Sequence, residues 1–327
     1  MIGMKVLIMR SQSGMSLVEL MVALVISLFL SAGIFTMFSM SASNVTTTSQ
    51  FNQLQENGRI ALAIMERDLS QLAFMGDMTG TDFIVGSNTT ISSAAVPNDC
   101  VGGGVNNATL PNGTTSHFRR IWGYEAGVSG DVFACLSGVK AKTDVLQIKR
   151  LVGPNTLTPN VASSHYVATT SSEAIFFTGN QPTPTLTNSR FWEYQHHIYY
   201  VKDDGAVPVL RRRTLTVANG MNNEEQLVEG IENLRVLYGV DDDGDDIPNR
   251  YVPVGSVDTV MWDNQSFQRI VALKLFLLVR AVEKDASYKN ETQYQLGDKT
   301  IAAPQDNYRR KVMSTTVMLE NPVLIRS

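Results

Sequence analysis

Residues 241–246 are the part of the sequence best suited to binding a metal ion. They place five carboxylates in six positions, and such groups repel one another unless water or a cation separates them. Carboxylates at alternate positions are typical of the first, third and fifth ligands of a calcium loop. The pattern departs from an EF-hand because Asp246 replaces the turn glycine and Val252 replaces the bidentate glutamate. The sequence therefore predicts either a partial calcium loop of lower affinity or a solvated acidic turn, and it indicates no other cofactor. The calcium ligands would be Asp241, Asp243, Asp245 and Asn249.

The two cysteines, Cys100 and Cys135, are too few for a thiolate zinc cluster or a scaffold of several disulfides. A bond between them would close a 36-residue loop. The chain-entropy model gives such a loop a stabilisation of about 4 kcal/mol. If the domain is exported to an oxidising compartment, we expect this disulfide to form. Two buried free thiols and a redox-active pair are the alternatives.

The histidines do not form a catalytic set in the sequence. His196 and His197 are adjacent, so on a strand their side chains point to opposite faces and cannot share a metal ion. We expect one of them to be packed and the other exposed. His117 and His165 fall in predicted loops. The sequence contains no Gly-x-Ser-x-Gly, His-Glu-x-x-His or Walker motif, so we do not expect an enzyme.

Two short basic runs, 211–213 and 309–311, could in principle contact nucleic acid. Basic residues beside strands more often protect a sheet edge from pairing with another chain. The whole chain carries 27 Lys and Arg against 31 Asp and Glu, a formal charge of −4. This balance excludes a polybasic nucleic-acid binder, and no nucleic-acid partner is expected.

The first forty residues divide sharply in composition. Residues before Gly14 include Lys5 and Arg10, whereas 15–40 is apolar or small apart from one acid, Glu19. A helix of 26 residues would be roughly 39 Å long, which is enough to cross a hydrocarbon core of about 30 Å. The basic flank should stay in the cytoplasm, so the rest of the chain would be translocated.

A cleaved signal peptide and a plain membrane anchor are the alternatives for this segment. The apolar run is longer than the roughly 7 to 15 residues of a signal-peptide core. An acid costs about 2.5 to 3.5 kcal/mol near the centre of a membrane helix, so Glu19 needs a functional explanation in either case.

The residues around Glu19 resemble the class III leader site of type IV prepilins and type II secretion pseudopilins. The resemblance implies that prepilin peptidase cleaves after Gly14 and that the new amine of Met15 is methylated. It also implies that Glu19, the fifth mature residue, pairs with the N-terminal amine of a neighbouring subunit. The matching string is Ser13-Gly14-Met15-Ser16-Leu17-Val18-Glu19-Leu20.

A second stretch of helix is predicted after the membrane segment. Apolar residues recur at helical spacing after residue 50, so we expect an amphipathic helix that continues to about Phe74. Gly58 is a point where this helix could bend. The apolar positions are Phe51, Leu54, Ala61, Leu62, Met65, Leu69 and Leu72.

Beyond Gly76 short strand-like runs replace the helical pattern, and no strand–helix alternation follows. The sequence predicts an α+β fold in which a long N-terminal helix packs on an antiparallel β-sheet head. Residues 198–201 and 209–212, joined through Asp203-Asp204-Gly205, predict a hairpin. Two stretches, 77–119 and 152–190, predict long surface loops. The other predicted strands are 145–151, 174–177, 234–240, 270–279 and 312–319.

Three segments of the head, 230–241, 273–280 and 309–322, resemble PilW-type minor pilins. The resemblance implies a minor pilin that primes type IV pilus assembly and stays near the pilus tip. The implied partners are other minor pilins, the major pilin, prepilin peptidase, a pilus-tip adhesin and the inner membrane. A minor pseudopilin of type II secretion, or a membrane-tethered periplasmic enzyme or sensor, are the alternatives. The predicted parts are a leader (1–14), a membrane and filament-core helix (15–40), its amphipathic continuation (41–75) and a periplasmic head (76–327).

Overall fold

The computed structural model describes residues 14–266 and 268–321, so the predicted leader falls almost wholly outside the described residues. The first element is helix α1 (Leu17–Leu69), which runs without a break. The chain divides into two units whose border lies within this helix, between Phe51 and Asn52.

The first unit consists of the N-terminal part of α1. Its large apolar side chains are exposed from Met15 to Met40. Within the described residues, α1 is the one helix that is long and apolar enough to cross a membrane, with a mean hydropathy of 2.4 in its most apolar window. Exposed apolar surface of this extent needs a covering of lipid or of other apolar helices.

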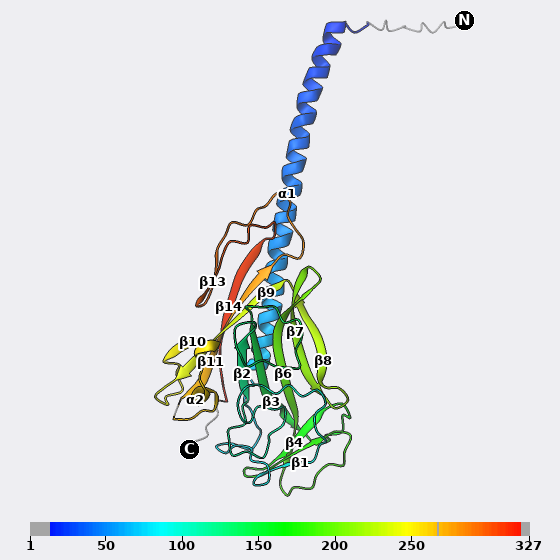
Figure 1. The fold of residues 1–327 in the computed structure, drawn as a ribbon. Helices are drawn as coiled ribbons and strands as arrows, with labels where there is room; N and C mark the ends of the chain where they lie inside the picture. Colours follow the sequence, from blue (N-terminus) through cyan, green and yellow to red (C-terminus); the bar gives the residue numbers. More distant parts are fainter. Residues whose placement is uncertain (1–13, 267, 322–327) are drawn as a thin grey trace, which may run out of the picture. The chain divides into compact units, whose positions relative to one another are not determined.

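The second unit is a head built mainly on an eight-stranded sheet (Figure 1). The strand order is β1-β5-β4-β6-β3-β2, and β7 pairs with β6 and β8. Among the strands of this sheet only β1 and β5 pair in parallel. The strands are β1 (Thr89–Ile91), β2 (Ile121–Glu125), β3 (Asp144–Thr156), β4 (His165–Thr169), β5 (Ala174–Thr178), β6 (Arg190–Asp204), β7 (Val207–Thr216) and β8 (Gly220–Glu229).

A second sheet has the order β10-β9-β11-β14, and all its pairs are antiparallel. Arg235 of β9 donates to Asp144 of β3 over 3.0 Å, which connects the two sheets. The remaining elements are β9 (Ile231–Asp241), β10 (Arg250–Pro253), η1 (Val254–Ser256), α2 (Thr259–Trp262), β11 (Arg269–Arg280), β12 (Tyr294–Leu296), β13 (Lys299–Ile301) and β14 (Arg310–Met318).

The last turns of α1 belong to the core of the head. Leu54, Ala61, Met65 and Leu69 are buried in the same apolar cluster as the strands of both sheets, as the helical spacing predicts. Gly58 lets the second sheet approach closely, because a Cβ at this position would overlap Met313 and lie 3.0 Å from a methyl of Val279. The helix does not end or break at this glycine.

The structure confirms the α+β class and the antiparallel head, including the hairpin between β6 and β7. The prediction of a loop over 152–190 is wrong, since this stretch holds the end of β3 and all of β4 and β5. All five residues of β4 are buried, so the strand shows no alternation of apolar and polar residues. Within 77–119 the one named strand is β1. Helix α1 ends at Leu69, five residues before its predicted end at Phe74.

β6 is central in the larger sheet, and its two edges differ. One edge pairs with β3. The other edge pairs with β4 as far as Tyr194 and with β7 from His197 onward. Gln195 and His196 therefore have no partner strand on that edge among the described strands.

Candidate functional site

The predicted processing and pairing residues lie at the start of the first unit. Gly14 and Met15 are exposed, and α1 begins two residues later. The backbone N–H of Ser16 donates to Glu19 Oε2 over 2.9 Å, so this carboxylate caps the first turn of the helix. A carboxylate is also favoured at this end by the helix dipole. Cleavage after Gly14, methylation of Met15 and pairing of Glu19 with another subunit remain predictions.

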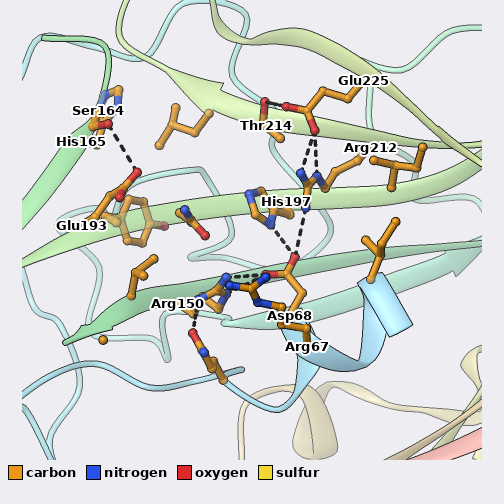
Figure 2. Close-up of a pocket in the computed structure, with 18 residues that line it drawn as sticks. Arg67, Asp68, Arg150, Ser164, His165, Glu193, His197, Arg212, Thr214 and Glu225 are labelled. Carbon is orange, nitrogen blue, oxygen red and sulfur yellow. Dashed lines mark hydrogen bonds and ion pairs between the residues drawn. The ribbon is translucent and has the colours of Figure 1, made fainter. Parts of the chain in front are cut away.

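A second polar centre, within the head, lies where the end of α1 meets the larger sheet (Figure 2). Asp68 is buried there and accepts hydrogen bonds from three residues on the strands. Arg150 donates to Oδ1 over 2.5 and 2.8 Å, and the His197 and Tyr199 side chains each donate to Oδ2 over 2.5 Å. Because a carboxylate only accepts, His197 carries its hydrogen on Nδ1.

The partners of Asp68 determine its protonation. Burial alone would raise the pKa of Asp68, but the hydrogen bond and charge of His197 together with Arg150 and Tyr199 hold the pKa well below its usual range. Burial raises the pKa of Tyr199, and the neighbouring carboxylate raises it further. Asp68 is therefore ionised at neutral pH, and it fixes the end of α1 to β3 and β6.

Asp68 is a residue that the sequence analysis did not single out. It lies three positions after Met65 and seven after Ala61, so it occurs on the buried face of α1. A carboxylate within an otherwise apolar stripe was the available signal. Its partners could not be found in the same way, because His197 lies 129 positions away along the chain.

The predicted disulfide is present between Cys100 and Cys135, with 5.3 Å between the Cα atoms. Cys100 precedes β2 in the chain and lies in the apolar core, and Cys135 lies between β2 and β3. The bond therefore joins two long loops on either side of β2. The alternative of two free thiols is not supported.

The acidic run forms the turn between β9 and β10. One carboxylate oxygen from each of Asp241, Asp243 and Asp245 lies within 4.8 Å of the others, as a cation site requires. Asp241 is buried and accepts from the backbone N–H groups of Asp243, Gly244 and Asp246. Burial alone would raise the pKa of Asp241, but these bonds and Arg269 hold it below its usual value.

Arginines balance part of the charge in this turn. Arg269 lies 3.2 Å from Asp241 and 3.1 Å from Asp246, and Arg250 lies 2.8 Å from Asp242. The side chain of Asn249 is engaged within the turn, since its oxygen accepts from the Asp242 N–H and its nitrogen donates to Asp243. The oxygen of Asn249, the fourth predicted ligand, already accepts one hydrogen bond within the turn, and calcium binding stays a prediction.

The histidines and the basic runs are engaged inside the head. The expectation that one of His196 and His197 is exposed is wrong, because both side chains are buried. Nδ1 of His196 lies 2.9 Å from the hydroxyl oxygen of Thr109. The two strand faces are both covered at this point. The basic runs are balanced by acids, as in the contact of Arg212 with Glu225 at 2.7 Å and of Arg309 with Asp285 at 2.7 Å.

Comparison with protein families gives two matches. The family described as Type IV Pilus-assembly protein W matches residues 198–321, which run from β6 to the end of the second sheet. The prokaryotic N-terminal methylation motif matches residues 9–35, which include Gly14 and Glu19. No curated protein and no solved structure matches the chain significantly.

The methylation motif, the long apolar helix and the antiparallel head define a prepilin-like type IV pilin. Within this class the match over residues 198–321 supports a PilW-type minor pilin of the type IV pilus. The motif and the apolar helix fit a membrane-anchored protein, and the pilin matches indicate a structural role rather than an enzymatic one.

Proposed function

We propose that this protein primes assembly of the type IV pilus and occupies a position at or near the pilus tip. The observation that carries the proposal is one chain with a prepilin methylation motif, an apolar helix and a PilW-type head. The head is large, comprising most of the chain after residue 52. A large head is difficult to repeat along a thin filament, which supports a capping position.

The mechanism would be assembly by helix packing without chemical turnover. Prepilin peptidase would cleave after Gly14, and residues 15–40 would pass from the inner membrane into the filament core. The exposed apolar side chains of this segment would pack on the helices of other pilins. Glu19 would form a charge-assisted pair with the amine of a neighbouring subunit, which favours one register over others.

The proposal places the head in the periplasm and later on the assembled pilus, with 1–14 removed as leader. Its expected partners are other minor pilins, the major pilin and a pilus-tip adhesin. Arg212 and Arg309 of the basic runs are paired with acids of the same head, which does not favour a nucleic-acid-binding role.

Deleting the gene in its own host tests the function. We expect loss of surface pili and of twitching motility, both restored by the wild-type gene. Normal piliation with failed protein secretion would instead indicate a pseudopilin of type II secretion. Normal piliation and normal secretion would favour a membrane-tethered enzyme or sensor.

Two measurements test the N-terminal mechanism directly. Mass spectrometry of the native protein should find a mature chain that begins at a methylated Met15. Glu19→Ala should leave cleavage intact and reduce the amount of the protein recovered in sheared pili. Glu56→Ala, which removes an exposed acid of the same helix, is the matched control. Unchanged recovery of the Glu19 variant would contradict the proposed pairing.

A further inference from the structure

A polar cleft of about 560 Å³ lies on the larger sheet beside the end of α1 (Figure 2). It occurs where β4 ends its pairing with β6 and β7 begins, so Gln195 lies in the gap between two partner strands. Arg67 and Gln71 line it from the C-terminal end of α1 and the turn that follows. Its volume is within the range of about 300 to 1,000 Å³ that small-molecule sites occupy.

Several polar groups of this cleft have unused hydrogen-bonding capacity. His165 is 5% exposed, and its Nδ1 is buried without a hydrogen-bond partner in the described part of the chain. The same holds for Oε1 of Gln195. His197 commits Nδ1 to Asp68, which leaves Nε2 available. Such groups are rare in folded proteins unless water or a ligand satisfies them.

The charges of the cleft cancel. Its lining holds three guanidinium groups and three carboxylates, and two pairs are in direct contact, Arg150 with Asp68 and Arg212 with Glu225. Burial lowers the pKa of His165 to about 4, so this ring is neutral at pH 7. An anion or a cation bound here would meet a like charge close by. The lining favours an uncharged ligand whose groups both donate and accept.

We propose that this cleft binds a saccharide, whose hydroxyl groups would satisfy His165, Gln195 and His197. A hydroxyl supplies one donor and two acceptor positions, so it can pair with either an imidazole nitrogen or an amide oxygen. Leu215 and Leu227 also line the cleft and offer apolar surface for the carbon face of a sugar ring. The head would then recognise a ligand in addition to its role in assembly.

Isothermal titration of the full chain tests the proposal. The protein is kept in a polyoxyethylene detergent, because an alkyl glycoside would itself present a sugar headgroup. The neutral probes are maltose, lactose and N,N′-diacetylchitobiose, and the anionic probes are N-acetylneuraminic acid and inorganic phosphate. We expect at least one neutral disaccharide to bind, and Gln195→Leu to weaken that binding at least about tenfold, which corresponds to about 1.4 kcal/mol.

Matched variants separate the cleft from other surfaces. Arg67→Gln, which changes the lining, should weaken binding, whereas Arg59→Gln on the same helix outside the cleft should not. Should Gln195→Leu fail to fold, His165→Phe provides the same test. The proposal is overturned if no neutral probe binds with a Kd of about 10 mM or tighter. This Kd corresponds to a binding free energy near −3 kcal/mol. The proposal would also be overturned if phosphate bound more tightly than any neutral probe. Equal loss of disaccharide affinity in the two arginine variants would overturn it as well.

Discussion

At the scale of single residues, buried charge determines how the head holds α1. Asp68 is ionised, buried and surrounded by donors from β3 and β6. Removing one partner of a buried ion pair costs about 3 to 5 kcal/mol, because the other charge is left uncompensated. Exposed pairs contribute about 1 kcal/mol or less.

Asp68→Asn should therefore lower the free energy of unfolding of the head by about 3 to 5 kcal/mol, because it leaves Arg150 without a counter-charge and takes the carboxylate acceptor from His197. Thermal unfolding followed by tryptophan fluorescence measures the change. Glu56→Gln, in an exposed pair with Arg59, is the control and should cost about 1 kcal/mol or less. Equal effects of the two substitutions would contradict this role of Asp68.

The same residue predicts a dependence on pH. Because the folded-state pKa of Asp68 is below the ordinary value of 3.8, its stabilisation is present above pH 3.8 and is lost as the pH falls further. The melting temperature of the wild type should fall between about pH 4 and pH 2. The Asn variant should lose less over this interval, since it has no carboxylate to protonate. Parallel curves for the two proteins would refute the assignment.

The acidic turn makes a separate prediction at this scale. If Asp241, Asp243 and Asp245 bind calcium, an ion concentration about 100 times the Kd should stabilise the folded protein by about 2.7 kcal/mol. Asp243→Ala should abolish the rise in melting temperature, and Glu173→Ala, at an exposed acid elsewhere, should preserve it. If neither calcium nor a chelator changes the melting temperature, the run is a solvated turn.

At the scale of elements, the last turns of α1 join the two sheets of the head. Near Gly58 the helix packs on β11 and β14, and near Asp68 it packs on β3 and β6. Asn57 also donates to the backbone oxygen of Glu229 at the end of β8. The helix α1 thus packs on both sheets. A change in its side-chain packing should therefore alter the stability of the whole head.

Gly58→Leu should destabilise the head by about 1 to 3 kcal/mol, because the new side chain would displace Met313 and Val279 from their positions. Tryptophan fluorescence during thermal unfolding reports this change. Gly33→Leu is the matched control, since a Cβ there meets nothing within 4 Å. A destabilisation of equal size in both variants would show that close packing at Gly58 is not the cause.

At the scale of the whole molecule, one disulfide constrains the head. The bond between Cys100 and Cys135 closes a long loop around β2. Replacing both cysteines with serine should lower the free energy of unfolding by about 4 kcal/mol through the gain of entropy in the unfolded chain. Reduction of the wild type should reproduce the loss in calorimetry. An unchanged melting temperature after reduction would contradict this contribution.

The sequence alone determined the features that depend on neighbours a few positions apart. The apolar run after Gly14, the position of Glu19, the helical stripe at Leu54 to Leu69 and the hairpin between β6 and β7 follow from local periodicity and turn residues. The pairing of the two cysteines could be expected because no third cysteine competes.

Contacts between residues that are distant in the sequence became evident from the three-dimensional packing. β4 was missed because burial on both faces removes the alternation of apolar and polar residues. The contacts of Asp68 with His197 and Tyr199, and the cleft at Gln195, depend on where β4 and β7 end along β6. Such contacts depend on how whole elements pack and on the register between them. Sequence periodicity does not reveal that register.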